Sequence, residues 1–228
     1  MTPGDGAVTR GGGGATRGGE PARAVISDFG GVLTVPLVEA FTAYHEASGI
    51  GPGDLGRAMA QATERSGGEH PLYELEKGAI SELEFQRRLE AELGDGVGLE
   101  GFRETYFAHL HANAQMVDYL RDLRDRGLRV AMLTNNVREW DPLWRAKLPD
   151  LDDIFELVVD SAFVGMRKPD PAIYRLTLER MGEGLRAEEC VFVDDLEINC
   201  DAARELGMRA VRFVDNEQGI PEIEAALG

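Results

Sequence analysis

Four short segments of this 228-residue chain hold polar side chains that could carry out phosphoryl transfer. In chain order, these side chains are Asp28, Thr134, Lys168 and the adjacent pair Asp194 and Asp195. Carboxylates are hard oxygen ligands that suit Mg2+, and a carboxylate beside such an ion can attack phosphorus. An ammonium group neutralises the charge of the transferred phosphoryl group. The set therefore predicts magnesium-assisted chemistry on a phosphorylated small molecule.

The carboxylates and the lysine have separate expected roles. Asp28 and Asp195 are expected to hold Mg2+, with a free oxygen of Asp28 as the nucleophile and Lys168 as the cation that steadies the phosphoryl group. The pair of Asp194 and Asp195 is the strongest single indication. Two adjacent carboxylates after a buried strand repel each other unless a cation or a proton intervenes.

A second group of residues is expected to bind the phosphate. Thr134 can donate a hydroxyl hydrogen bond to it, and Asn135 follows directly in the chain. Gly30 and Gly31 come just after Asp28, where a missing side chain lets backbone amides approach a ligand closely. Asn199 also lies near the paired carboxylates, and packing and site roles are equally compatible with its position.

These residues need a scaffold that brings distant segments to one place. Short apolar runs typical of buried strands cover 24–29, 128–133, 155–159, 191–193 and 210–214. Amphipathic helical patterns cover 114–126, 171–181 and 197–206. Strands that alternate with helices predict an α/β fold with a parallel sheet covered on both faces, a three-layer arrangement. Ligands of such sheets bind beyond the carboxyl ends of the strands, where the polar segments lie.

The domain organisation follows from changes in pattern. Residues 1–23 are rich in glycine and nearly devoid of large apolar side chains, so we expect a flexible tail. Residues 37–111 have helical periodicity without strand-like alternation, and Ser81 opens a Ser-x-x-Glu capping box within them. The chain thus divides into a core of residues 24–36 and 112–228 and a helical insertion. Aromatic residues of the insertion are expected to form its core, and some to line the entrance of the site, among them Phe41, Phe85, Tyr106 and Phe107.

Composition excludes several classes of function. The chain has 24 Lys and Arg against 41 Asp and Glu, a formal net charge of -17, which disfavours nucleic acid and anionic membrane surfaces as partners. No apolar run reaches the ~18 residues that a membrane span needs. Two cysteines, Cys190 and Cys200, cannot build a disulfide framework, so we expect a reduced, cytoplasmic protein. The oligomeric state has no signature in the sequence.

The four polar segments, in this order, resemble the four motifs of the haloacid dehalogenase-like superfamily. The stretches VGMRKPDPAIY and VFVDDLEINCDAARELGM are similar to the third and fourth motifs in one branch. That branch contains phosphatases similar to the N-terminal domain of soluble epoxide hydrolase and bacterial sugar-phosphate phosphatases. The helical insertion resembles the small helical cap of the family, and the resemblance covers residues 24–214.

The resemblance implies a Rossmann-like core with an inserted cap and a Mg2+-dependent phosphatase that acts through an aspartyl-phosphate. Asp28 would be the nucleophile, while Thr134 and Lys168 would contact the phosphate. The implied metal ligands are Asp28, Asp195 and the carbonyl oxygen of Gly30, with Asp194 as an outer or second metal carboxylate.

The sequence departs from the family pattern at Gly30. Most phosphatases of the family have there a second aspartate, which protonates the leaving oxygen and then activates water. Three alternatives remain open: a leaving group that needs little protonation, a replacement group from the cap, or binding without turnover. The anomeric, acyl and aryl phosphates are examples of the first, and the histidines of the insertion or its edge are candidates for the second: His45, His70, His109 and His111. We favour slow hydrolysis, because the nucleophile, the lysine and the metal carboxylates are all present.

Two other functions are compatible with an aspartate nucleophile or a phosphate site. A metal-independent dehalogenase also uses such a nucleophile, although the paired carboxylates at 194 and 195 would be unhelpful where a halide leaves. A phospho-ligand-binding or regulatory protein is the alternative that Gly30 makes plausible. Dependence on Mg2+ separates a phosphatase from a dehalogenase, and turnover separates both from a binding protein.

Overall fold

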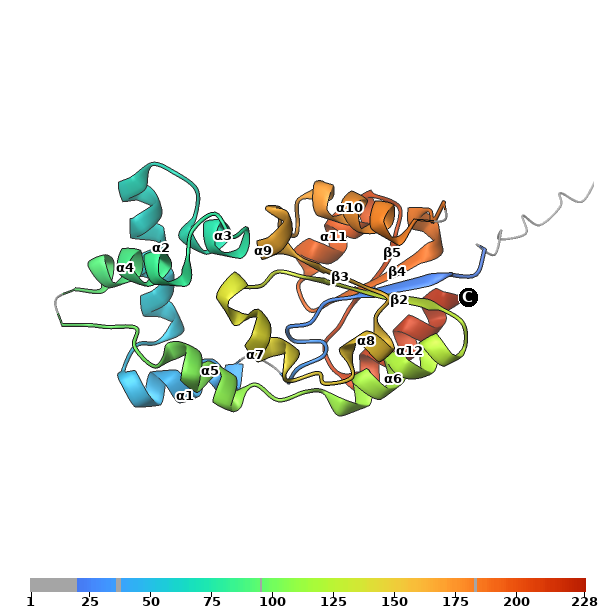
Figure 1. The fold of residues 1–228 in the computed structure, drawn as a ribbon, viewed down its shortest axis with the longest axis horizontal. Helices are drawn as coiled ribbons and strands as arrows, with labels where there is room; N and C mark the ends of the chain where they lie inside the picture. Colours follow the sequence, from blue (N-terminus) through green and yellow to red (C-terminus); the bar gives the residue numbers. More distant parts are fainter. Residues whose placement is uncertain (1–19, 36–37, 95, 183) are drawn as a thin grey trace, which may run out of the picture.

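A five-stranded parallel sheet lies at the centre of the computed structural model, which describes residues 20–35, 38–94, 96–182 and 184–228 (Figure 1). The strands have the order β3-β2-β1-β4-β5, and every neighbouring pair is parallel. Their bounds are β1 (Ala24–Ser27), β2 (Arg129–Thr134), β3 (Leu157–Asp160), β4 (Cys190–Asp194) and β5 (Arg209–Arg212). The predicted strands and the predicted α/β class are confirmed.

Helices cover both faces of the sheet. Helices α6 (Ala114–Asp125), α8 (Leu151–Ile154) and α12 (Asn216–Leu227) pack on one face, and α10 (Pro171–Met181) and α11 (Glu197–Glu205) on the other (Figure 1). Successive residues of β1 point to opposite faces, so Val25 joins the first core cluster and Ile26 the second. Because both faces are buried, β1 and β4 are buried along their whole length. The predicted three-layer arrangement is confirmed.

The helices between β1 and α6 form a group of their own, which we call the inserted helices. They are α1 (Val38–Ser48), α2 (Pro52–Ser66), α3 (Pro71–Glu76), α4 (Glu82–Leu93) and α5 (Phe102–His109). Several of their buried apolar side chains, among them Tyr44, Leu55 and Leu89, make a separate cluster, whereas Phe107 joins the first core cluster. Figure 1 places them at one end of the molecule, beyond the sheet. A division of the chain at residues 37 and 111 stays a prediction.

The capping box at the start of α4 is half formed. The Ser81 hydroxyl oxygen accepts a hydrogen bond from the Glu84 backbone N–H at 3.2 Å, as an N-cap does. The Glu84 carboxylate instead pairs with Arg88, one turn further along the helix, at 2.8 Å.

None of the described helices combines the length and the apolar character needed to span a bilayer.

Short elements connect the layers near the inserted helices. They are the 3-10 turn η1 (Arg138–Trp140) and the helices α7 (Asp141–Arg145) and α9 (Ser161–Val164); the 3-10 turn η2 (Ala187–Glu189) precedes β4. The end of α3 docks on α9, where the Ser161 hydroxyl donates to the Glu76 carbonyl oxygen at 2.5 Å. The Glu76 carboxylate also forms an ion pair with Arg167 at 2.6 Å. The inserted helices are therefore fastened to the loop that carries Lys168.

The N-terminal segment reaches the core earlier than expected. The Ala22 N–H donates to the carbonyl oxygen of Leu227 at 2.9 Å, and the Arg23 N–H donates to that of Glu189 at 2.8 Å. These contacts differ from the expectation of a flexible segment up to residue 23. The remainder of the predicted tail, residues 1–19, lies outside the described residues.

Asp160, at the end of β3, is a buried carboxylate whose charge affects the stability of the fold. Its Oδ1 accepts the Ala162 N–H at 2.9 Å and caps α9, while its Oδ2 is buried without a partner in the described part of the chain. Burial raises the pKa of Asp160 from 3.8 to about 6. The folded protein then binds the proton more tightly than the unfolded chain does, so this group lowers stability as the pH rises from about 4 to about 6.

The change Asp160→Asn keeps the cap and removes the buried charge. We expect the free energy of unfolding to increase by about 1–2 kcal/mol at pH 8 and to change little at pH 4. Urea unfolding at the two pH values measures this difference. An equal increase at both would contradict an electrostatic origin.

Candidate active site

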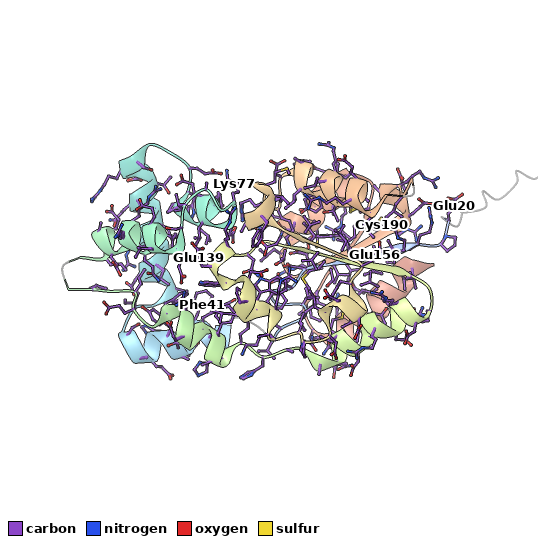
Figure 2. All side chains as sticks on the ribbon, in the orientation of Figure 1. Glu20, Phe41, Lys77, Glu139, Glu156 and Cys190 are labelled. Atoms are coloured by element: carbon purple, nitrogen blue, oxygen red, sulfur yellow. The ribbon has the colours of Figure 1, made fainter. Side chains whose placement is uncertain are left out.

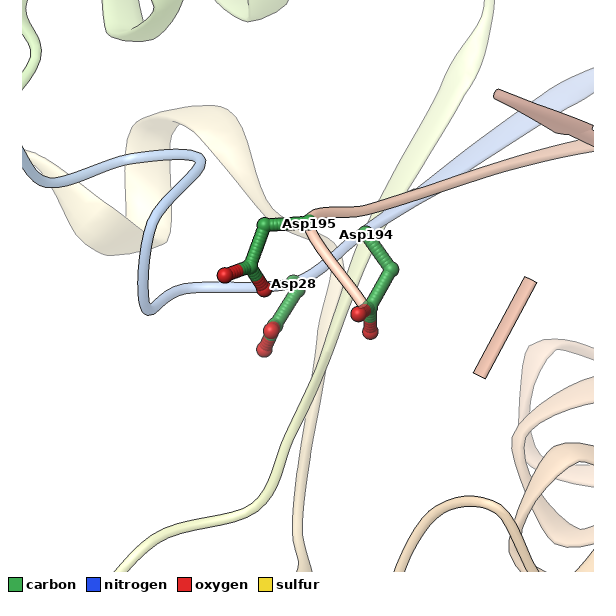
Figure 3. Close-up of side chains that lie close together, drawn as sticks. All are labelled: Asp28, Asp194 and Asp195. Carbon is green, nitrogen blue, oxygen red and sulfur yellow. The ribbon is translucent and has the colours of Figure 1, made fainter. Parts of the chain in front are cut away.

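The carboxyl ends of β1 and β4 bring three aspartates together (Figure 3). Ser27 is opposite Val193 in the parallel ladder, so Asp28 and Asp194 leave the sheet at the same level. The Asp28 N–H extends the ladder with a hydrogen bond to the Val193 carbonyl oxygen at 2.8 Å. Asp28, Asp194 and Asp195 each offer a carboxylate oxygen, and these oxygens all lie within 4.8 Å of one another.

Lys168 lies between two of these carboxylates. Its Nζ is 2.8 Å from Oδ1 of Asp28 and 2.6 Å from Oδ2 of Asp194, and only 1% of its side chain is exposed. Burial favours the neutral amine, but the carboxylates of Asp194 and Asp28 hold the pKa of Lys168 above its usual value. The lysine is therefore a fixed positive charge against Asp28.

Asp194 is fully buried behind this site. Its Oδ2 accepts from Lys168, and its Oδ1 accepts the Leu196 N–H at 2.9 Å. The Asn199 side-chain amide donates to both oxygens, at 2.9 and 3.1 Å. Since both oxygens are engaged, we expect Asp194 to act through Lys168 and not as a direct metal ligand. Asn199, whose role the sequence left open, holds this carboxylate.

The site carries excess negative charge. Burial raises the pKa of Asp28 to about 7, opposed by Lys168 and reinforced by Asp194 and Asp195. Burial and Asp194 likewise raise the pKa of Asp195. One ammonium group cannot neutralise three converging carboxylates, so a bound divalent cation would relieve their repulsion. The donor set thus fits Mg2+, with Asp28 and Asp195 as the side chains positioned to hold it.

A cavity of about 220 Å³ opens in front of these carboxylates. Six residues with an expected catalytic, phosphate-binding or metal-binding role line it: Asp28, Gly30, Thr134, Asn135, Lys168 and Asp195. Asn199 also lines it. Asp194 and Gly31 are not part of its wall. We call this space the catalytic cavity.

Gly31 and Asn135 have structural partners. The Gly31 N–H donates to Oγ1 of Thr34. Gly31 has a positive φ of 72°, and a Cβ there would lie 2.7 Å from Oδ2 of Asp195, so both the backbone and the space favour glycine. The Asn135 amide oxygen accepts the Lys168 N–H at 2.8 Å, and its Nδ2 donates to the Lys168 carbonyl oxygen at 3.0 Å. Their placement favours positioning of Asp195 and Lys168 over direct phosphate contact.

Several residues in the wall of the catalytic cavity were not predicted from the sequence. Glu76 and Arg167 form an ion pair there, and Trp140 and Trp144 add aromatic surface. Adjacency to Lys168 is the one sequence signal that could have indicated Arg167. Tyr106 and Phe107, which the sequence assigned to the insertion core with a possible place at the entrance, do line the cavity.

The histidines lie elsewhere. None of His45, His70, His109 and His111 is in the wall of the catalytic cavity. The His109 ring contacts the carbonyl oxygen of Thr105 within α5, and the His70 ring stacks on Tyr73 at 4.7 Å. Their placement gives no support to a histidine that replaces the missing acid.

Comparison with known proteins agrees with this geometry. The chain is 29% identical to sesquiterpene phosphatase astK of Aspergillus oryzae, over 90% of this chain and 97% of that protein. It is 29% identical to mouse acyl-CoA dehydrogenase family member 10 over 92% of the chain, and 25% identical to pig bifunctional epoxide hydrolase 2 over 90%. The chain spans 20% of the length of the mouse protein and 39% of the epoxide hydrolase. The predicted resemblance to this branch is confirmed.

Solved structures share the fold. An enzyme of the same family from Bacteroides thetaiotaomicron, in complex with magnesium and inorganic phosphate, superposes with a TM-score of 0.65. It is 23% identical, and the match covers 86% of this chain and 96% of that one. The sequence model of the haloacid dehalogenase-like hydrolases matches residues 22–207. This chain belongs to the haloacid dehalogenase-like hydrolase family.

Proposed function

We propose that the protein is a Mg2+-dependent phosphatase that hydrolyses a small phosphorylated metabolite through an aspartyl-phosphate on Asp28. One observation carries the proposal: Asp28 faces the catalytic cavity with Lys168 at 2.8 Å and Asp195 beside it. The name of the fungal relative, a sesquiterpene phosphatase that this chain matches over nearly its whole length, supports the same chemistry.

The geometry around Asp28 distinguishes its two oxygens. Oδ1 accepts the Phe29 N–H at 2.7 Å and pairs with Lys168, so Oδ2 is the oxygen that can attack phosphorus. Mg2+ held by Asp28, Asp195 and the Gly30 carbonyl oxygen would supply the charge that screens the phosphate from the carboxylates. Lys168 and the Thr134 hydroxyl would bind the phosphoryl oxygens as charge shifts to the leaving group.

Both halves of the reaction lack the side chain that usually transfers the proton. Gly30 lines the cavity but has no side chain to protonate the leaving oxygen or to activate water. The Glu76 carboxylate, which the inserted helices contribute to the wall, is held by Arg167. General acid and base catalysis contributes roughly 100- to 10,000-fold, so we expect slow turnover and preference for good leaving groups.

The proposal includes the cap and the cellular compartment. The inserted helices contribute Glu76, Tyr106 and Phe107 to the catalytic cavity, which supports a cap formed by residues 37–111. A cytoplasmic location is supported by Cys190 and Cys200, which are buried as free thiols.

Phosphate release in the presence and absence of Mg2+ tests the function. With p-nitrophenyl phosphate and glucose 1-phosphate, we expect release with Mg2+ to exceed release with EDTA by at least about 100-fold. The Asp28→Asn protein is the blank. Release no greater than this blank would contradict an enzyme, and release insensitive to EDTA would contradict the metal. Chloride release from 2-chloropropionate would instead indicate a dehalogenase.

A further inference from the structure

A second cavity, of about 310 Å³, lies between the inserted helices and residues 135–140 of the core. Its wall is mostly hydrocarbon, contributed by side chains that include Phe41, Met59, Leu72, Phe85, Leu89 and Phe102. Figure 2 shows Phe41 on the side of the inserted helices and Glu139, of η1, at their boundary with the core. We call this space the apolar cavity.

The apolar cavity adjoins the catalytic cavity. The two share the wall residues Glu76, Tyr106, Asn135, Asn136 and Trp140. A molecule whose phosphate sits at Asp28 therefore has this cavity as the adjacent space for its organic group.

Aromatic rings form the boundary between the cavities. The rings of Tyr106 and Trp140 are 5.1 Å apart, and that of Phe102 is 6.1 Å from the first and 6.2 Å from the second. Tyr106 and Trp140 face both cavities, whereas Phe102 faces the apolar one. Aromatic surfaces of this kind fix the orientation of an apolar ligand without demanding hydrogen bonds.

Charged groups at the apolar cavity are already paired. The Glu76 carboxylate binds Arg167 at 2.6 Å, and the Glu82 carboxylate binds Arg103 at 2.9 Å. Among the described residues that line the cavity there is no lysine, arginine or histidine. A second phosphate or a carboxylate would find no free cation there, and sugar hydroxyls would lose water without full replacement of their hydrogen bonds.

We propose that the substrate is an amphipathic phosphate monoester whose organic group is a hydrocarbon chain or ring that occupies the apolar cavity. The inference rests on the proposed function, because it names the substrate class of the same site. The inserted helices would then recognise an apolar group, and not a sugar, as the organic part of the substrate.

A series of phenyl phosphates with para-alkyl chains from methyl to hexyl tests the substrate class. All members have nearly the same leaving group, so kcat/KM reports binding of the chain and not the missing acid at Gly30. Below the concentration at which they aggregate, we expect kcat/KM to rise by about fourfold per methylene until the cavity is filled. A chain of equal length that ends in a hydroxyl group should lose most of this gain. A flat series would overturn the inference.

A matched pair of tryptophan variants tests whether the alkyl chain of the substrate occupies the apolar cavity. Met59→Trp fills part of the apolar cavity, whereas Leu83→Trp changes a side chain on α4 that is 56% exposed and lines neither cavity. We expect the ratio of kcat/KM for the hexyl and methyl members to fall by at least about tenfold in the first variant. The ratio should keep its wild-type value in the second. Equal ratios in the two variants would overturn the placement of the alkyl chain in the apolar cavity.

Binding of the corresponding phosphonates separates the proposed substrate class from the proposed function. In a phosphonate a P–C bond replaces the P–O bond to the leaving group, so it cannot be hydrolysed there. Calorimetry with the full chain and Mg2+ should give affinities that rise with chain length in parallel with kcat/KM. If no phosphate is turned over but phosphonate affinity still rises, the substrate class stands as a ligand class and the proposed function fails. If phosphate is released but neither kcat/KM nor phosphonate affinity changes with chain length, the proposed phosphatase function stands and the proposed substrate class is wrong.

Discussion

Asp28→Asn is expected to lower kcat/KM for phosphate release by at least about 10,000-fold while the protein stays folded. The amide has no charged oxygen to attack phosphorus, and it removes a carboxylate from the metal site. Its oxygen can still accept the Phe29 N–H that Oδ1 of Asp28 accepts at 2.7 Å. Phosphate release under Mg2+ saturation measures the loss, and the exposed Asp152→Asn is the matched control that should retain activity.

The same variant should be more stable than the wild type at pH 8 without Mg2+. Burial raises the pKa of Asp28 from 3.8 to about 7, so the folded protein binds this proton more tightly than the unfolded chain. Wild-type stability then falls as the pH rises from about 4 to about 7, and the asparagine removes this fall. Lys168 retains Asp194 as its partner at 2.6 Å.

We expect a gain of about 1–3 kcal/mol at pH 8 and little at pH 4, from urea unfolding in EDTA. A large loss of stability at pH 8 would mean that the lost activity reflects unfolding, and it would contradict the assignment of Asp28 as a nucleophile held at a cost in stability.

The strands could be predicted because their signal is local. Continuous apolar runs such as Cys190–Asp194 exist because helices cover both faces of the sheet, so the pattern itself records burial. Helix α12 was not predicted, since Gly219 and Pro221 interrupt its pattern. Gly219 is suited to its place by a tertiary contact, because a Cβ there would collide with the Phe213 ring of the preceding loop. Such a contact is visible only in three dimensions.

The candidate site divides in the same way. Asp28 and Asp195 follow strands and could be placed at one edge from the sequence alone. The partners of polar side chains could not, because they depend on long-range packing. The amide of Asn135 serves the backbone of Lys168, 33 positions away, and no local pattern records that use. Glu76 reaches the cavity only because α3 docks on the segment that begins at Ser161.

Gly30→Asp is expected to raise kcat by roughly 100- to 10,000-fold for substrates with poor leaving groups, such as alkyl phosphates. Gly30 lines the catalytic cavity and, unlike Gly31, does not have a positive φ, so its backbone accepts a side chain. A carboxyl group there could protonate the leaving oxygen and then activate water against the aspartyl-phosphate. For p-nitrophenyl phosphate, whose leaving group needs little protonation, the gain should be much smaller.

The contrast between leaving groups is what identifies general acid catalysis. A new carboxylate could also strengthen Mg2+ binding. That effect would raise the rate equally for all substrates when Mg2+ is limiting, and it would leave kcat unchanged at saturating Mg2+. Gly31→Asp provides the matched control, because its positive φ and the carboxylate of Asp195, 2.7 Å from the new Cβ, oppose any side chain. We expect that variant to lose activity on every substrate. An equal gain for alkyl and aryl phosphates in Gly30→Asp would show that proton transfer does not limit the wild-type enzyme, and slow turnover would then need a cause other than the absent aspartate.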